Sequence, residues 1–337
     1  MKALYSLFLV FALAAIALVG AGALGMEHVF GLYIPFLAVA VFVVGFCLKV
    51  VGWGRSAVPF CIPTTCGQQE SLPWIKQNSI DNPSTTGGVV MRMILEVLLF
   101  RSLFRNTKVD LHKGTRVTYG SSKWLWLGAL AFHYAFLVIV IRHMRFFAEP
   151  VPGLISGIET LDSILQIGAP TLYLTDLVFV AAVTYLFLRR VVVPQIRYIS
   201  QVQDYFPLFL ILGIAFTGIF MRYFVKSDII SVKELTMGLV TFSWVIPEGI
   251  GVLFYIHLFL VSVLLMYFPL SKLMHMGGVF LSPTRNMNCA SRKFRHINPW
   301  KFENVQYHTY PEYEDEFREK MVETGLPVDK PLEEGAE

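Results

Sequence analysis

The sequence predicts an all-α integral membrane protein that folds as a bundle of six helices. Two observations predict this class. Of the 337 residues, 55% are hydrophobic and only 15% are charged, with a mean hydropathy of +0.58. The apolar residues also gather in runs of roughly 20, the length that a helix needs to cross a bilayer. A soluble domain of this size would need more polar surface. The formal net charge of +4 is modest and does not indicate nucleic acid binding.

Each predicted helix corresponds to one apolar run. The six runs are residues 3–24, 29–51, 123–146, 170–190, 204–224 and 247–274. The first run is also compatible with a cleaved signal peptide, because Lys2 precedes it and Ala21, Gly22 and Ala23 are small. It is long for such a peptide, so we expect a retained span.

The distribution of Lys and Arg predicts the orientation of the six spans. Cations are concentrated in residues 52–122, in the short loop after the fourth span, and in the tail after the sixth. These regions share one side of the membrane if there are six spans, and the opposite loops hold more acidic residues. We therefore expect a multi-pass protein of the cell (cytoplasmic) membrane with both termini in the cytoplasm.

Residues 88–106 make the number of spans uncertain, because they form an apolar run that charged residues interrupt. Arg92 and Glu96 are one turn apart and can pair. We expect an amphipathic helix in the cytoplasmic interface; the alternative is a seventh span, which would invert every later element. The resulting domains are a two-span extension (1–52), a cytoplasmic loop with the interfacial helix (53–122), a four-helix unit (123–278) and a cytoplasmic tail (279–337).

Four histidines lie in or at the ends of predicted spans, His133 and His143 in the third and His257 and His275 in the sixth. A single membrane histidine is usually a polar residue bonded to a neighbouring helix. Two on each of two helices suggest more. Because the two spans run in opposite directions, His133 and His275 both lie toward the cytoplasm, and His143 and His257 toward the outside. We call these the inner pair and the outer pair.

Two facing imidazoles without a nearby thiolate or carboxylate suit a haem iron with two axial ligands. A closed zinc site would need four ligands together. Without a C-x-x-C-H motif, the haems would not be covalently attached. Room for a macrocycle between helices needs small residues, although these also serve ordinary helix packing. The candidates are Gly128, Gly213, Gly218 and Gly251.

Two stretches carry a resemblance to known families. The segment YIHLFLVSVLLMYFPLSKLMHMGG (255–278) resembles the last haem helix of respiratory nitrate reductase gamma subunits, including the FP-x-S-K-L-x-H ending, and FH-x9-H at 132–143 resembles their other haem helix. This likeness covers about residues 120–280. The stretches 61–74 and 132–152 resemble the membrane cytochrome b subunits (subunit M) of dissimilatory sulfite reductase-associated electron transfer complexes.

The resemblance implies a di-haem b cytochrome core that exchanges electrons with menaquinone in sulfate or sulfite respiration. It also implies a cytoplasmic iron–sulfur partner related to heterodisulfide reductase, and further membrane and extracytoplasmic cytochrome c or iron–sulfur subunits. The inner pair would then lie nearest the partner and the outer pair nearest the quinone. The alternative is a transporter or structural anchor whose histidines relay protons or pack, which a visible absorption spectrum would distinguish.

Other polar residues have two readings each. Asp176 lies within the fourth span, where it either handles protons beside a quinone or bonds to a neighbouring helix. Arg142 and Arg145 flank His143 and either contact haem propionates or quinone, or extend to lipid headgroups. Cys61 and Cys66 form a C-x4-C in the loop, and we expect a structural thiol pair or a partner contact rather than a cluster or redox switch.

The tail is basic and aromatic at first and then acidic, with a short helix expected at 311–323. Its length and its aromatic residues suggest that it docks to a partner; a partly disordered tail is the alternative. The aromatic residues are Trp300, Tyr307, Tyr310 and Tyr313.

Overall fold

The computed structural model describes residues 1–58, 60–111, 116–165, 170–294 and 307–331. It separates into two compact units, residues 1–293 and 294–337. Trp300, one of the aromatic residues expected to dock the tail, lies outside the described residues.

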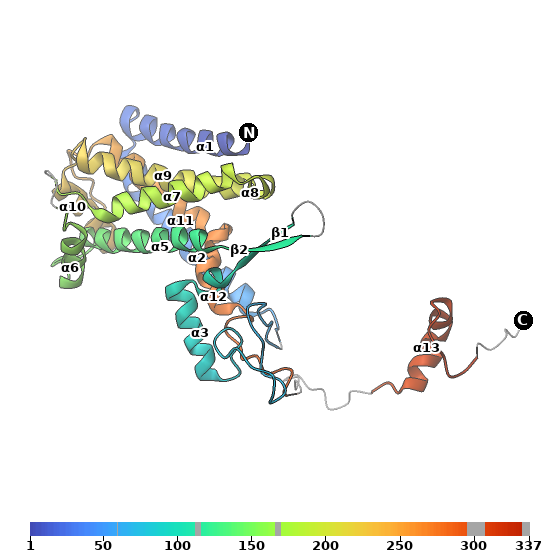
Figure 1. The fold of residues 1–337 in the computed structure, drawn as a ribbon. Coiled ribbons are helices and arrows are strands. Elements are labelled where there is room, and N and C mark those ends of the chain that lie inside the picture. Colours follow the sequence, from blue (N-terminus) through green and yellow to red (C-terminus); the bar gives the residue numbers. More distant parts are fainter. Residues whose placement is uncertain (59, 112–115, 166–169, 295–306, 332–337) are drawn as a thin grey trace, which may run out of the picture. The chain divides into compact units, whose positions relative to one another are not determined.

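Helices make up most of the first unit (Figure 1). The long ones are α1 (Lys2–Ala17) with its continuation η1 (Leu18–Ala23), η2 (Val29–Tyr33) with α2 (Ile34–Gly54), α5 (Lys123–His143), α7 (Leu174–Val192), α9 (Val202–Tyr223) and α11 (Val252–Tyr267). The shorter ones are α3 (Thr86–Leu99), α4 (Arg101–Arg105), η3 (Met144–Phe146), α6 (Gly153–Asp162), α8 (Pro194–Ile199), α10 (Ile229–Thr241), η4 (Phe268–Leu270), η5 (Lys272–Met274) and α12 (His275–Leu281).

Five helices are long and apolar enough to cross a membrane among the residues described. They are Lys2–Ala23, Val29–Gly54, Lys123–Phe146, Val202–Tyr223 and Val252–Leu270. The fold class predicted from the sequence, an all-α membrane protein, is therefore confirmed. The remaining predicted span corresponds to α7, which has 19 residues and carries Asp176 near its start and two arginines near its end.

Small groups of buried side chains hold the long helices together. One group joins α5, α7 and α9 through Ala135, Val183 and Ile211, and another joins α1, α9 and α11 through Val10, Leu210 and Leu260. Large apolar side chains remain on the outside of α1 and α2, as is usual where lipid rather than water surrounds a helix.

The last predicted span is not one continuous helix. α11 ends at Tyr267, and Pro269 lies in the single turn η4, because proline has no N–H for the helical ladder and its ring clashes with the preceding turn. A second turn, η5, follows Ser271, and α12 begins at His275. The position of His275 therefore depends on these turns and not on the regular helical periodicity assumed in the sequence analysis.

The segment between α2 and α5 holds the expected amphipathic helix in two pieces. α3 and α4 are separated by Phe100, whose backbone is in the left-handed region with a φ of 50°. α3 buries Arg92 and Glu96 and exposes apolar side chains such as Met91 and Ile94. A hairpin follows that the sequence analysis did not predict, with β1 (Thr107–Leu111) antiparallel to β2 (Val117–Ser121).

Among the described residues of the second unit, 307–331, lies the helix α13 (Tyr310–Glu323), which matches the helix expected near 311–323. Thr309 and Glu312 form a capping box at its start, which satisfies the free N–H groups of the first turn. Glu314 is buried and accepts hydrogen bonds from the backbone N–H groups of Asp329 and Lys330, so the chain after the helix folds back on it.

Candidate functional site

The structure brings the four span histidines together in two pairs. In the inner pair, the ring centroids of His133 on α5 and His275 on α12 are 5.9 Å apart, and the ring planes are at 85°. In the outer pair, the centroids of His143 at the end of α5 and His257 on α11 are 6.4 Å apart, at 13°. These partners are those expected from antiparallel spans.

Each ring uses its Nδ1 atom for a hydrogen bond with the protein. His133 Nδ1 lies 2.7 Å from Ala129 O, and His143 Nδ1 lies 2.7 Å from Ile139 O, both one turn earlier in α5. An Nδ1–H that donates to a carbonyl leaves Nε2 as the unprotonated nitrogen, which is the form that binds a metal.

The other two rings follow the same rule through different acceptors. His275 Nδ1 lies 2.8 Å from Lys272 O in η5, a carbonyl that the turn after Ser271 positions. His257 Nδ1 lies 2.9 Å from the hydroxyl of Thr217 on the neighbouring helix α9.

The ring separations fit an iron bound between two imidazoles. A metal–imidazole bond is about 2 Å long, so two such bonds and the two half-rings span about 6 Å, close to both measured centroid distances. No group of three or more His, Cys, Asp or Glu side chains in the described part of the chain is arranged to hold a metal ion. Paired imidazoles of this kind suit a bis-histidine haem better than a tetrahedral zinc site.

Two aromatic rings contact His133 of the inner pair. Phe100, the left-handed residue between α3 and α4, contacts His133 edge-to-face with centroids 5.0 Å apart, and Phe132 does so at 4.9 Å. The loop is also anchored to α5 here, because Tyr134 donates a hydrogen bond to Leu98 O and Trp126 to Leu99 O. The loop helix α3 is therefore attached directly to the helix that carries His133.

Beside the outer pair, Arg142 is the centre of a buried ionic cluster. Its guanidinium lies 3.0 Å from Asp162 Oδ2 and 2.7 Å from Asp176 Oδ1, and its Cζ is 3.7 Å from the centroid of the Tyr173 ring. Arg222 stacks on Tyr173 as well, at 3.8 Å. Asp176, which the sequence analysis singled out, is therefore an ion-pair partner of Arg142 in the structure.

Arg145 belongs to a more exposed part of the same region. It pairs with Glu159 of α6, which also accepts a hydrogen bond from the Tyr173 hydroxyl, and Lys233 of α10 pairs with Glu149. A cavity of about 230 Å³ opens here, lined by Arg145, Phe146, Val151, Ser156, Glu159, Ile229 and Lys233. Phe146 links it to the outer pair, because its ring centroid is 6.1 Å from that of His143.

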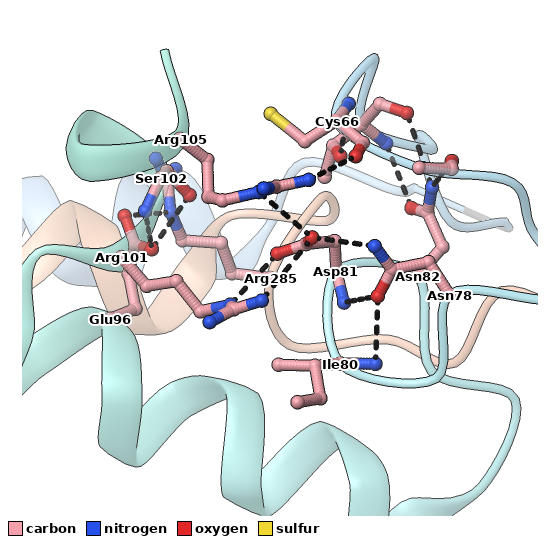
Figure 2. Close-up of polar contacts among 12 residues, drawn as sticks. Cys66, Asn78, Ile80, Asp81, Asn82, Glu96, Arg101, Ser102, Arg105 and Arg285 are labelled. Atoms are coloured by element: carbon pink, nitrogen blue, oxygen red, sulfur yellow. Dashed lines mark hydrogen bonds and ion pairs between the residues drawn. The ribbon is translucent and has the colours of Figure 1, made fainter. Parts of the chain in front are cut away.

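The loop before α5 is held by a separate polar network, shown in Figure 2. Asp81 accepts a hydrogen bond from Arg101 at 2.9 Å and lies 3.5 Å from Arg105. Glu96 accepts from the Ser102 hydroxyl at 2.6 Å and from Arg285, in the segment after α12, at 2.9 Å. The pair predicted between Arg92 and Glu96 is not among the ion pairs that the described residues form.

The thiol pairing also differs from the expectation. Cys61 contacts Cys289, with the sulfurs 2.7 Å apart, whereas Cys66 lies separately and is partly exposed. Burial raises the pKa of Cys61 to about 12, with a further contribution from Cys289. The backbone N–H of Cys289 donates to Pro83 O, so the two cysteines join the loop to the segment after α12. The C-x4-C spacing could not reveal a partner more than two hundred residues away.

Sequence reasoning missed Thr217 and left the glycines open between room for a macrocycle and ordinary helix packing. A Cβ on Gly218 would lie 3.3 Å from His257 Cε1, so this glycine does lie against a candidate ligand. Gly128 faces Tyr185, and Gly213 faces Val10 and Leu260. Thr217 carried no signal in one sequence, because a threonine in an apolar helix usually bonds only to its own backbone.

Most of the chain is similar in sequence to known proteins. The sequence model of the nitrate reductase gamma subunit family matches residues 90–288. A protein of Archaeoglobus fulgidus, described as an Hdr-like menaquinol oxidoreductase cytochrome b-like subunit, is 45% identical over 279 residues, which are 81% of this chain and 83% of that protein. A protein of Archaeoglobus profundus with the same description is 41% identical over 274 residues, 79% and 81% of the two chains.

Proposed function

Because the chain belongs to the nitrate reductase gamma subunit family, we propose that it is the di-haem b membrane subunit of a menaquinol oxidoreductase complex. It passes electrons between menaquinol in the membrane and a cytoplasmic iron–sulfur partner related to heterodisulfide reductase, in sulfate or sulfite respiration. The descriptions of both relatives support the quinol-linked role.

The two facing histidine pairs carry this proposal. The inner haem would be held by His133 and His275 and the outer haem by His143 and His257. His133 and His143 are ten positions apart in α5, which corresponds to about 15 Å along the helix. When bound, the haems supply one-electron redox chemistry. The protein fixes the ring orientation through the four Nδ1 hydrogen bonds and holds the two sites in line along the bundle.

We assign six spans, with α7 as the fourth, and both termini in the cytoplasm of the cell. α7 packs against α5 and α9. Its charged groups lie in its first and last turns; Asp176 is compensated by Arg142, and Arg189 and Arg190 would lie at the cytoplasmic boundary. A charge near a helix end, or one with a buried partner, is tolerated in a membrane.

The quinone is proposed to bind beside the outer pair, at the cavity lined by Arg145, Glu159 and Lys233. Oxidation of a quinol to a quinone releases two protons, which need an acceptor near the site. Glu159 lies on the cavity wall, and Asp176 is connected to the region through Arg142. We propose that a carboxylate oxygen of Asp176 accepts one of the two protons.

The partner is proposed to dock on the cytoplasmic loop and the tail. The loop is attached to α5 beside His133, the ligand nearest the partner in this topology. Its exposed surface carries apolar side chains, notably Trp74 at 77% exposure, Phe60 at 53% and Leu72 at 50%. Exposed aromatic side chains of this kind are typical of protein interfaces.

Paired replacements of the histidines test the proposal. The purified wild-type chain should contain two non-covalent b haems. The double variant H133L/H275L should retain one, and H143L/H257L should retain the other. The crossed double variant H133L/H257L, with the same number of changes, should lose both. A chain without haem, or a crossed variant that keeps one haem, would contradict the assignment.

A further inference from the structure

One of the four ligand rings is supported differently from the others. His133, His143 and His275 each reach a backbone carbonyl of their own segment, three or four residues earlier. His257 reaches across to α9, where its Nδ1 is 2.9 Å from Thr217 Oγ1. A carbonyl cannot be removed by substitution, whereas this hydroxyl can.

The hydroxyl of Thr217 is arranged to accept this hydrogen bond. It lies 2.9 Å from both Gly213 O and Ile214 O, the carbonyls four and three residues earlier in α9. A hydroxyl has one proton, and carbonyls can only accept. The proton of Thr217 is therefore directed to its own helix, and an oxygen lone pair faces His257. The ring then carries its proton on Nδ1, which leaves Nε2 unprotonated, the form that binds a metal.

The next residue of α9 completes the support. Gly218 has no side chain, and a Cβ built there would lie 3.3 Å from His257 Cε1. Thr217 and Gly218 therefore hold neighbouring atoms on one edge of the His257 ring, Nδ1 by a hydrogen bond and Cε1 by close backbone approach. The ring plane they hold is within 13° of that of His143, whereas the inner rings are nearly perpendicular.

We propose that Thr217, assisted by Gly218, is the positioning residue that sets the ring orientation and the redox potential of the outer haem. This inference rests on the proposed function, because it assumes that the outer pair binds a haem. An acceptor on Nδ1–H increases the electron density at Nε2, which strengthens the ligand and favours ferric iron. Loss of the acceptor should therefore raise the potential of the outer haem alone.

The test compares T217V with T217S in the purified full-length chain. Valine keeps the shape of threonine and removes the hydroxyl, and serine keeps the hydroxyl. We expect T217V to retain two haems and to shift the redox equilibrium of one of them toward ferrous iron by about tenfold, or 59 mV. T217S should behave as the wild type. S262A is a matched control, because the buried hydroxyl of Ser262 on α11 donates to Leu258 O of its own helix.

Electron paramagnetic resonance gives a second readout, because the angle between two axial ring planes determines the low-spin ferric spectrum. T217V should change one ferric signal and leave the other, and G218A, which presses on the ring, should change the same one. Loss of the outer haem in T217V with retention in T217S would also support the proposal, with the inner haem reporting an intact fold. Potentials and spectra of T217V equal to those of the wild type would overturn it. Fewer than two haems in the wild type would instead refute the proposed function.

Discussion

Removal of the Arg142 side chain is the most informative perturbation of the ionic cluster beside the outer pair. Arg142 and Asp162 are each only 6% exposed, and the guanidinium is within 3.0 Å of both Asp162 and Asp176. In R142M, two carboxylates would remain close together without their cation. Breaking a buried ion pair on one side costs about 3–5 kcal/mol, because an uncompensated charge is left behind. We expect the free energy of unfolding to fall by about this amount.

The double variant R142M/D176N is compared with R142M, because it also removes one of the two carboxylate charges that R142M leaves unpaired. If the cost comes from the uncompensated carboxylates, the second change should restore about 1–3 kcal/mol, the size of coupling usual for residues in one network. R142K tests charge alone, since lysine cannot stack on Tyr173 or bridge two carboxylates with a planar group. The free energy of unfolding of R142K should lie between those of the wild type and R142M.

Equilibrium unfolding in mixed micelles, followed by tryptophan fluorescence and haem absorbance, measures these differences. The denaturant midpoint and slope should be compared, because a changed slope would signal a changed unfolded state. The reasoning is wrong if R142M unfolds within about 1 kcal/mol of the wild type, or if D176N does not relieve it. Either result would mean that solvent reaches the cluster and screens its charges.

Three further outcomes are expected. D176N keeps the size of the side chain but cannot ionise, so menaquinol-dependent haem reduction should slow in stopped-flow measurements with both haems bound; an unchanged rate would leave Asp176 with a structural role only. Deletion of residues 294–337 should release the iron–sulfur partner on size-exclusion chromatography without altering the haem spectrum, and undiminished copurification would assign docking to the loop. With a pKa of about 12, only about one Cys61 thiol in 10⁴ is ionised at pH 8. Alkylation measured by mass spectrometry should therefore modify the partly exposed Cys66 before Cys61, and Cys61 should react only as the pH rises. Equal labelling of the two cysteines at pH 8 would show that the buried thiol pair is open to solvent.

The sequence alone determined the membrane class, the positions of the long helices and the spacing of the ligand candidates. Each of these depends on local properties: a run of apolar residues long enough for a bilayer, and a periodicity that places side chains on a helix. The pairing of His133 with His275 was also expected from antiparallel order, although the continuous helix used to derive it is interrupted at Pro269.

Only the tertiary structure decided which groups surround those histidines. Thr217 meets His257 from forty residues away, and Cys289 meets Cys61 from more than two hundred. Arg142 pairs with Asp162 and Asp176, which come from different segments. Glu96 pairs with Arg285 and not with Arg92, which lies one turn away on α3. Such contacts depend on how helices rotate and approach one another. That is decided by the packing of many side chains at once and leaves no periodic signal in a single sequence.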